Sequence, residues 1–254
     1  MFIDQRNSIY VGNLGPIPLF LHWSFIFLLF TAFRWSSGGG QFDMVQAMLF
    51  AVVLLSAILL HEMGHGMAAR AYGAVGVKIT LWAFGGLCSS TRDRLPGREI
   101  VILAAGPVVS FLLAWFGVLG LQIIGRMSPE TLVGGQRFGA DLIQHLAATD
   151  WRMLVDVALY EGSIVARLLA LMFTVNLLLG IFNIFPIYPL DGGQIVHNGL
   201  SMAIGERRAN KATLVIAFIA AIACFAYFSR PGDLNIHLAL LLSFLLFNAY
   251  SYLR

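Results

Sequence analysis

An apolar stretch leads directly into two histidines and a glutamate: residues 44–70 read MVQAMLFAVVLLSAILLHEMGHGMAAR. A helix needs about 20 mostly apolar residues to cross the hydrocarbon core of a bilayer. Ionisable side chains inside such a span are costly, which makes them candidates for function. On a helix His61 and His65 lie one turn apart on nearly the same face, so both imidazoles can reach one metal ion, with Glu62 beside them.

Five other segments share this apolar character. The chain is 59% hydrophobic and only 11% charged, whereas a soluble domain carries about 25% charged residues. No Lys/Arg-rich run is present, which argues against a nucleic-acid partner. We predict an all-α polytopic membrane protein, a single membrane-embedded domain over residues 1–254, with six transmembrane helices at about 17–33, 44–70, 99–121, 163–184, 212–229 and 235–252.

Two connections between these spans have a pattern of their own. Residues 77–88 are too few for a span and rich in β-formers, which predicts a short re-entrant β segment after the second helix. Such a segment is tolerated at membrane depth where it is buried in protein or lines a wet cavity; a cytoplasmic hairpin is the alternative. The connection 122–162 is expected to be a structured loop, with one or two interfacial helices within 141–160 as the alternative.

The distribution of basic residues predicts the orientation. With six spans, ten Lys and Arg lie on the side that carries both termini, against six on the other side. Cytoplasmic loops carry the excess of Lys and Arg. We therefore expect a multi-pass protein of the cell (inner) membrane, with both termini and the opening of the site in the cytoplasm.

A third metal ligand is suggested where the fourth span ends, in residues 183–193, NIFPIYPLDGG. Two prolines break the helix there, and the paired glycines allow close backbone approach. The second and fourth spans run in the same direction, so Asp191 can meet the two histidines. The alternatives are a surface turn for Asp191 and a helix-packing pair for the histidines. The residues thus predict a His₂Asp metal site with Glu62 adjacent to it.

HEMGH on the second span and NIFPIYPLDGG on the fourth together resemble the site-2 protease family of intramembrane zinc metalloproteases. LHWSF at 21–25, AFGG at 83–86 and AAGP at 104–107 extend the resemblance over most of the chain. It implies that His61, His65 and Asp191 ligate one Zn²⁺ per chain and that Glu62 is the general base and acid. It also implies that Asn183 contacts the substrate or the intermediate.

The resemblance further implies regulated intramembrane proteolysis in a minimal form, without PDZ or CBS domains. Substrates in this family are single-span membrane proteins such as anti-sigma factors, transcription-factor precursors or signal peptides, cut in or near their membrane segment within the bilayer. The chain departs from the family pattern at Gln194, where Arg is frequent, and at Ser110, where Asn is frequent.

The main alternative function is a polytopic zinc or divalent-metal transporter, because one transporter family also carries H-E-x-x-H on a membrane helix. The sequence offers no second metal-binding helix and no His-rich loop, and transport leaves PLDGG unexplained.

Three structural expectations remain. An edge strand at about Val77–Phe84 would capture an unwound substrate by β-addition. Asn176 would form a hydrogen bond between helices. Gly106 and Pro107 would kink the third span or pack it closely against the second.

Overall fold

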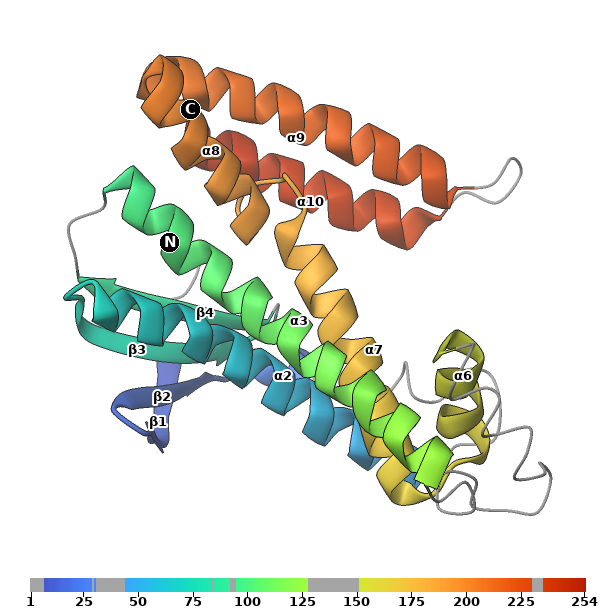
Figure 1. Ribbon diagram of the computed structural model, residues 1–254. Coiled ribbons are helices and arrows are strands. Elements are labelled where there is room, and N and C mark those ends of the chain that lie inside the picture. The colour runs from blue at the N-terminus through green and yellow to red at the C-terminus, as the bar shows by residue number, and fades with distance from the viewer. Residues whose placement is uncertain are drawn as a thin grey trace.

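The computed structural model describes residues 7–28, 30, 44–83, 85–91, 95–127, 151–229 and 235–254. These residues are mostly helical, with a small sheet beside the helices (Figure 1). The helices are α2 (Met44–Ala71), α3 (Pro96–Met127), α6 (Trp151–Glu161), α7 (Ile164–Ile184), α8 (Asp191–Ile204), α9 (Glu206–Phe228) and α10 (Ile236–Leu253). The strands are β1 (Ser8–Leu14), β2 (Ile17–His22), β3 (Val75–Trp82) and β4 (Gly85–Thr91). The all-α expectation is thus corrected to a helical protein that contains a four-stranded sheet.

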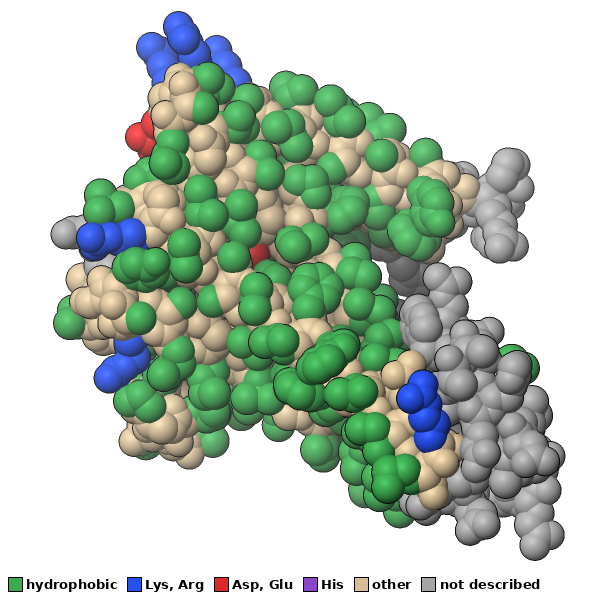
Figure 2. Space-filling model, viewed as in Figure 1, with side chains coloured by type: hydrophobic (Ala, Val, Ile, Leu, Met, Phe, Trp, Pro, Cys, Tyr) green, Lys and Arg blue, Asp and Glu red, His purple; other side chains and the backbone are tan. Residues whose placement is uncertain are grey.

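Four of the described helices are long and apolar enough to cross a membrane: α2, α3, α7 and α9. The apolar part of α10, Leu238–Leu253, is shorter. Hydrophobic side chains cover much of the face in Figure 2, and Lys and Arg lie toward its margins. Helices that are apolar around their whole circumference are typical of a lipid environment. The chain therefore has the character of a multi-pass membrane protein.

The predicted first span is wrong at its start. Residues Ile17–His22 form β2, which pairs with β1 through a turn at Gly15, where φ is +57°. A short apolar run fits a buried strand as well as a helix, and the glycine turn and pairing partners decide for the strand here. Among the remaining residues of that segment, 25–28 and 30 are helical, and 29 and 31–33 lie outside the described residues.

The sheet has the order β1-β2-β3-β4. β2 and β3 are parallel, with Leu19 opposite Ile79 and Leu21 opposite Leu81, and α2 makes the long crossover that a parallel pair requires. The prediction of an edge strand at 77–84 is therefore wrong, because β2 and β4 occupy both sides of β3. Of the two strands that follow α2, β4 is the one at the edge of the sheet.

The helices α2 and α7 begin at the same end of the bundle, and α3 runs antiparallel between them (Figure 1). Small residues allow this packing. A side chain at Gly64 of α2 would collide with the carbonyl oxygen of Ala105, and one at Gly117 of α3 would collide with the backbone of Phe173. The ends of α2 and α7 that carry the two motifs are consequently brought together.

The helix α6 falls in the connection 122–162, of which residues 128–150 lie outside the described residues.

Candidate metal centre

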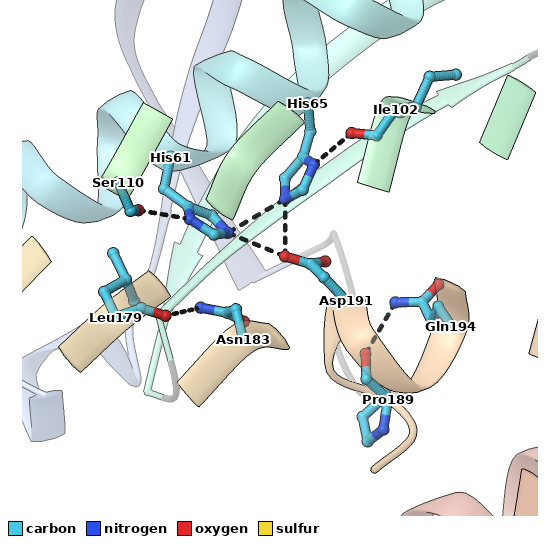
Figure 3. A network of polar contacts seen from close by, with 9 residues as sticks. All are labelled: His61, His65, Ile102, Ser110, Leu179, Asn183, Pro189, Asp191 and Gln194. Carbon is cyan, nitrogen blue, oxygen red and sulfur yellow. Dashed lines mark hydrogen bonds and ion pairs between the residues drawn. The ribbon is translucent and has the colours of Figure 1, made fainter. Parts of the chain in front are cut away.

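Three ligand atoms converge where α2 meets the first turn of α8. The Nε2 atoms of His61 and His65 lie 3.2 Å apart, and each lies 3.2 Å from Oδ2 of Asp191 (Figure 3). In a tetrahedral zinc site with bonds of about 2.0–2.1 Å, ligand atoms are about 3.3 Å apart. Two imidazoles and a carboxylate are also ligands that zinc accepts. The donor set and its spacing therefore fit a single zinc ion.

The helix α3 holds both imidazoles from their far side. Nδ1 of His65 donates to the carbonyl oxygen of Ile102 at 2.8 Å, and Nδ1 of His61 lies 3.0 Å from Oγ of Ser110. Because a carbonyl only accepts, the proton of a neutral His65 is on Nδ1, and Nε2 presents its lone pair to the centre. Partners of this kind fix the tautomer and ring orientation of metal-binding histidines.

The loop after α7 positions the carboxylate of Asp191. Side chains at Gly192 and Gly193 would collide with backbone atoms of residues 184–188, so the glycine pair lets the first turn of α8 lie directly on that loop. Gln194 adds a hydrogen bond from Nε2 to the carbonyl oxygen of Pro189 at 2.8 Å, and the Tyr188–Pro189 peptide bond that precedes this carbonyl is cis. The predicted meeting of the two motifs is present, although the metal-binding role remains a prediction.

The charge state of Asp191 suits cation binding. Asp191 is only 8% exposed. Burial acts to raise its pKa, but the two neighbouring histidines, when protonated, outweigh that effect and hold the pKa of Asp191 below its ordinary value. A metal cation shared with the neutral histidines would act on the carboxylate in the same direction. Among the described residues, His61, His65 and Asp191 form the one group of three or more such side chains close enough to share a metal ion.

Two glycines fit closely around these side chains. Gly106 of α3 faces the histidines: a Cβ there would collide with the His65 imidazole and lie 2.8 Å from Nε2 of His61. Gly86 of β4 faces Glu62, and a Cβ there would collide with the Glu62 side chain. The predicted close packing of Gly106 against the second span is thus confirmed.

Glu62 lies beside the three converging residues. It is 8% exposed, interacts electrostatically with both histidines and Asp191, and forms a hydrogen-bonding contact with the backbone amide of Cys88. The start of β4 therefore packs directly against this carboxylate.

The two asparagines of α7 bond within their own helix. Nδ2 of Asn183 donates to the carbonyl oxygen of Leu179 at 3.0 Å, and the side chain lies near the centre with no hydrogen bond drawn to its three residues (Figure 3). One of its two amide hydrogens is thereby engaged and the other is left for another acceptor. Nδ2 of Asn176 donates to the carbonyl oxygen of Met172 at 2.8 Å, which corrects the expected bond between helices.

Sequence reasoning missed the face of α3 that supports the histidines. Ile102, Gly106 and Ser110 are spaced by four residues, so they form one stripe along the helix. Ser110 had been noted only as a departure from the family pattern, yet its side chain is fully buried against His61. The four-residue spacing around Gly106 places all three on one face of the helix, but it does not indicate that this face meets the histidines.

The buried pair of histidines four residues apart, with an intervening glutamate and a third ligand from another helix, is the arrangement of a zinc metallopeptidase centre. Residues 49–227 match the family described as Peptidase family M50, and the chain belongs to that family.

The similar proteins are zinc metalloproteases by name. Rip3 of Mycobacterium tuberculosis, a putative zinc metalloprotease, is 29% identical over 241 residues that cover 87% of this chain and 53% of that protein. A zinc metalloprotease of Methanocaldococcus jannaschii is 28% identical over 208 residues, 82% of this chain and 50% of that one. The chain thus spans about half the length of these relatives.

A solved structure, the site-2 protease from Methanocaldococcus jannaschii, is also similar to this chain. The structural match has a TM-score of 0.57 and a sequence identity of 28%, and it covers 97% of this chain and 95% of that one. The similarity therefore extends over nearly the whole length of both chains.

Proposed function

We propose that the protein is an intramembrane zinc metalloprotease that hydrolyses a peptide bond within or near the transmembrane segment of a membrane-protein substrate. The observation that carries this proposal is the convergence of His61, His65 and Asp191 at 3.2 Å, with Glu62 buried beside them. These three residues would hold one zinc ion, which supplies Lewis-acid polarisation of the scissile carbonyl and lowers the pKa of water. The family assignment and the names of the relatives support the same activity.

The residues of the chain take complementary roles in this reaction. Glu62 accepts the proton of the attacking water and later delivers it to the leaving amide nitrogen. Asn183 donates its remaining amide hydrogen to the developing oxyanion, a contribution of about 3–4 kcal/mol in other enzymes. His61 and His65 keep their orientation through Ser110 and Ile102. Desolvation of the site strengthens each of these electrostatic interactions.

The edge strand β4 is the proposed docking place for an unwound substrate. A helical substrate shields its backbone, so cleavage requires an extended segment whose hydrogen bonds are replaced. β4 lies at the edge of the sheet, and its residues Gly86 and Cys88 contact Glu62. A strand added there by β-augmentation would run past the carboxylate.

The setting of the activity is also part of the proposal. We place the protein in the cell (inner) membrane with both termini and the site opening in the cytoplasm, on the distribution of Lys and Arg. Single-span membrane proteins, such as anti-sigma factors, transcription-factor precursors or signal peptides, are the proposed substrates. No observation favours the transporter alternative, because the described residues hold a single cluster able to bind a metal.

The experiment is cleavage of a panel of single-span reporter proteins in vesicles by wild type, Glu62→Gln and Glu206→Gln. Glu206 is an exposed glutamate at the start of α9 and serves as the matched control. We expect wild type and Glu206→Gln to cut the same reporter, and Glu62→Gln to retain its zinc and lose cleavage. Cleavage by Glu62→Gln at the wild-type rate would refute the proposed role.

A further inference from the structure

The strand β2 ends in a buried histidine, His22, that lies outside the candidate metal centre. It is only 9% exposed and is not one of the three residues close enough to share a metal ion. Its Nδ1 lies 2.7 Å from Oγ of Ser24 and accepts the backbone N–H of Ser24 at 3.3 Å. Because a backbone N–H can only donate, Nδ1 presents its lone pair, and the proton of the neutral ring is on Nε2. The Ser24 hydroxyl therefore donates its hydrogen to His22.

The same hydroxyl joins the end of β2 to the end of β3. Oγ of Ser24 accepts the amide hydrogen of Ala83, the residue that directly follows β3, at 3.1 Å. The two strands are parallel, and the last backbone pair between them is Leu21 with Leu81. The Ser24 side chain thus connects the two chain segments beyond the point where backbone pairing ends.

This long-range bond takes the place of an ordinary helix cap. Ser24 directly precedes the short helical segment 25–28, and a serine in that position usually accepts the amide of the second or third helical residue. Here the amides of Ile26 and Phe27 donate to backbone carbonyl oxygens instead. The hydroxyl is therefore left to bind Ala83, which lies 59 positions away in the sequence.

The segment that Ser24 holds leads directly to the contacts of Glu62. The strand β4 begins at Gly85, two residues after Ala83, and β3 and β4 lie beside α2 (Figure 1). Gly86 faces Glu62 with no room for a Cβ, and the backbone amide of Cys88 contacts the same carboxylate. A shift at the start of β4 would therefore move the surface against which Glu62 packs.

We propose that His22 and Ser24 are positioning residues for the reaction, which fix the end of β3 and thereby hold β4 against Glu62. The inference rests on the proposed protease function, in which Glu62 is the general base. Without this network β3 and β4 still pair from Val75–Thr91 to Trp82–Gly85, so the edge of β4 stays available to a substrate. The network should consequently affect kcat more than KM.

The first test measures kcat and KM for the reporter in vesicles with two variants of Ser24. A general base contributes about 10²–10⁴-fold to a rate, so we expect Ser24→Ala to lower kcat at least tenfold, with KM changed less than threefold and zinc content unchanged. Ser24→Thr keeps the hydroxyl and should retain at least half of kcat. Ser163→Ala is the matched control, because the Ser163 hydroxyl also accepts a backbone amide, at the end of α7 remote from the centre.

Two variants of His22 test the other half of the network. His22→Phe keeps a ring beside Trp23 but removes the acceptor, and it should lower kcat as much as Ser24→Ala does. His22→Asn should retain at least half of kcat, because an asparagine side chain readily accepts the amide two residues further on. Equal kcat in the two His22 variants, or a wild-type kcat in Ser24→Ala, would overturn the proposal. Loss of zinc from Ser24→Ala would also overturn it, because the network would then support the metal ligands.

The second test needs no cleavage and follows hydrogen exchange of single amides in nanodiscs by mass spectrometry. In Ser24→Ala and His22→Phe the amides of Ala83 and Cys88 should exchange at least tenfold faster, while Ile79 in the middle of the sheet exchanges as in wild type. Unchanged exchange at Ala83 and Cys88, or faster exchange at Ile79 as well, would overturn the positioning role. The expected exchange pattern with no cleavage of any reporter by wild type would support the hold on β4 and count against the protease function alone.

Discussion

Replacing Gly106 by alanine should disrupt the metal centre with a single methyl group. The added Cβ would lie 2.8 Å from Nε2 of His61 and still closer to the His65 imidazole. Carbon and nitrogen atoms in contact need about 3.5 Å, so His61 must move by about 0.7 Å or α3 must retreat. Metal–ligand distances tolerate about 0.2 Å. The displacement is therefore about three times what the centre can absorb.

We expect Gly106→Ala to weaken zinc binding at least 100-fold, measured by competition with a chromophoric chelator. Gly97→Ala is the matched control on the same helix, because its Cβ would meet nothing closer than a methyl group of Met202 at 3.9 Å. Alanine is a better helix former than glycine by about 1 kcal/mol, so helix propensity does not explain a loss. Wild-type zinc affinity in Gly106→Ala would refute the derived packing against the histidines.

Two further variants separate metal binding from proton transfer. Ser110→Ala removes the hydroxyl 3.0 Å from Nδ1 of His61 and should lower zinc affinity about 10–100-fold; an unchanged affinity in the same competition assay would contradict its orienting role. Gly86→Ala pushes against Glu62, so reporter cleavage should fall toward the level of Glu62→Gln while zinc content stays at that of wild type. Loss of zinc from Gly86→Ala would show that β4 supports the ligands instead.

The local parts of the candidate centre could be predicted from the sequence. The spacing of His61 and His65 fixes their common face on any helix, and the break at 186–193 identifies Asp191 as a carboxylate near the end of another span. Their meeting also required that α2 and α7 run in the same direction, which followed from the order of the spans. The structure brings these residues to 3.2 Å.

The parts that could not be predicted depend on partners distant in the sequence. Residues 17–22 are apolar enough for a helix, and only pairing with β1 and β3 makes them a strand. The same pairing buries β3 inside the sheet and leaves β4 at the edge beside Glu62. The contact between Ser110 and His61 links residues 49 positions apart, and nothing in the periodicity of α3 alone specifies what its stripe faces.

The proposed metal centre requires ligands from both α2 and α8. Zinc per chain should be measured after dialysis for wild type, Asp191→Ala and Asp156→Ala, the last being an exposed acidic control on α6. We predict about one tightly bound zinc in wild type and Asp156→Ala, and its loss in Asp191→Ala. Zinc that washes out of wild type, or that remains bound in Asp191→Ala, would contradict the three-residue centre.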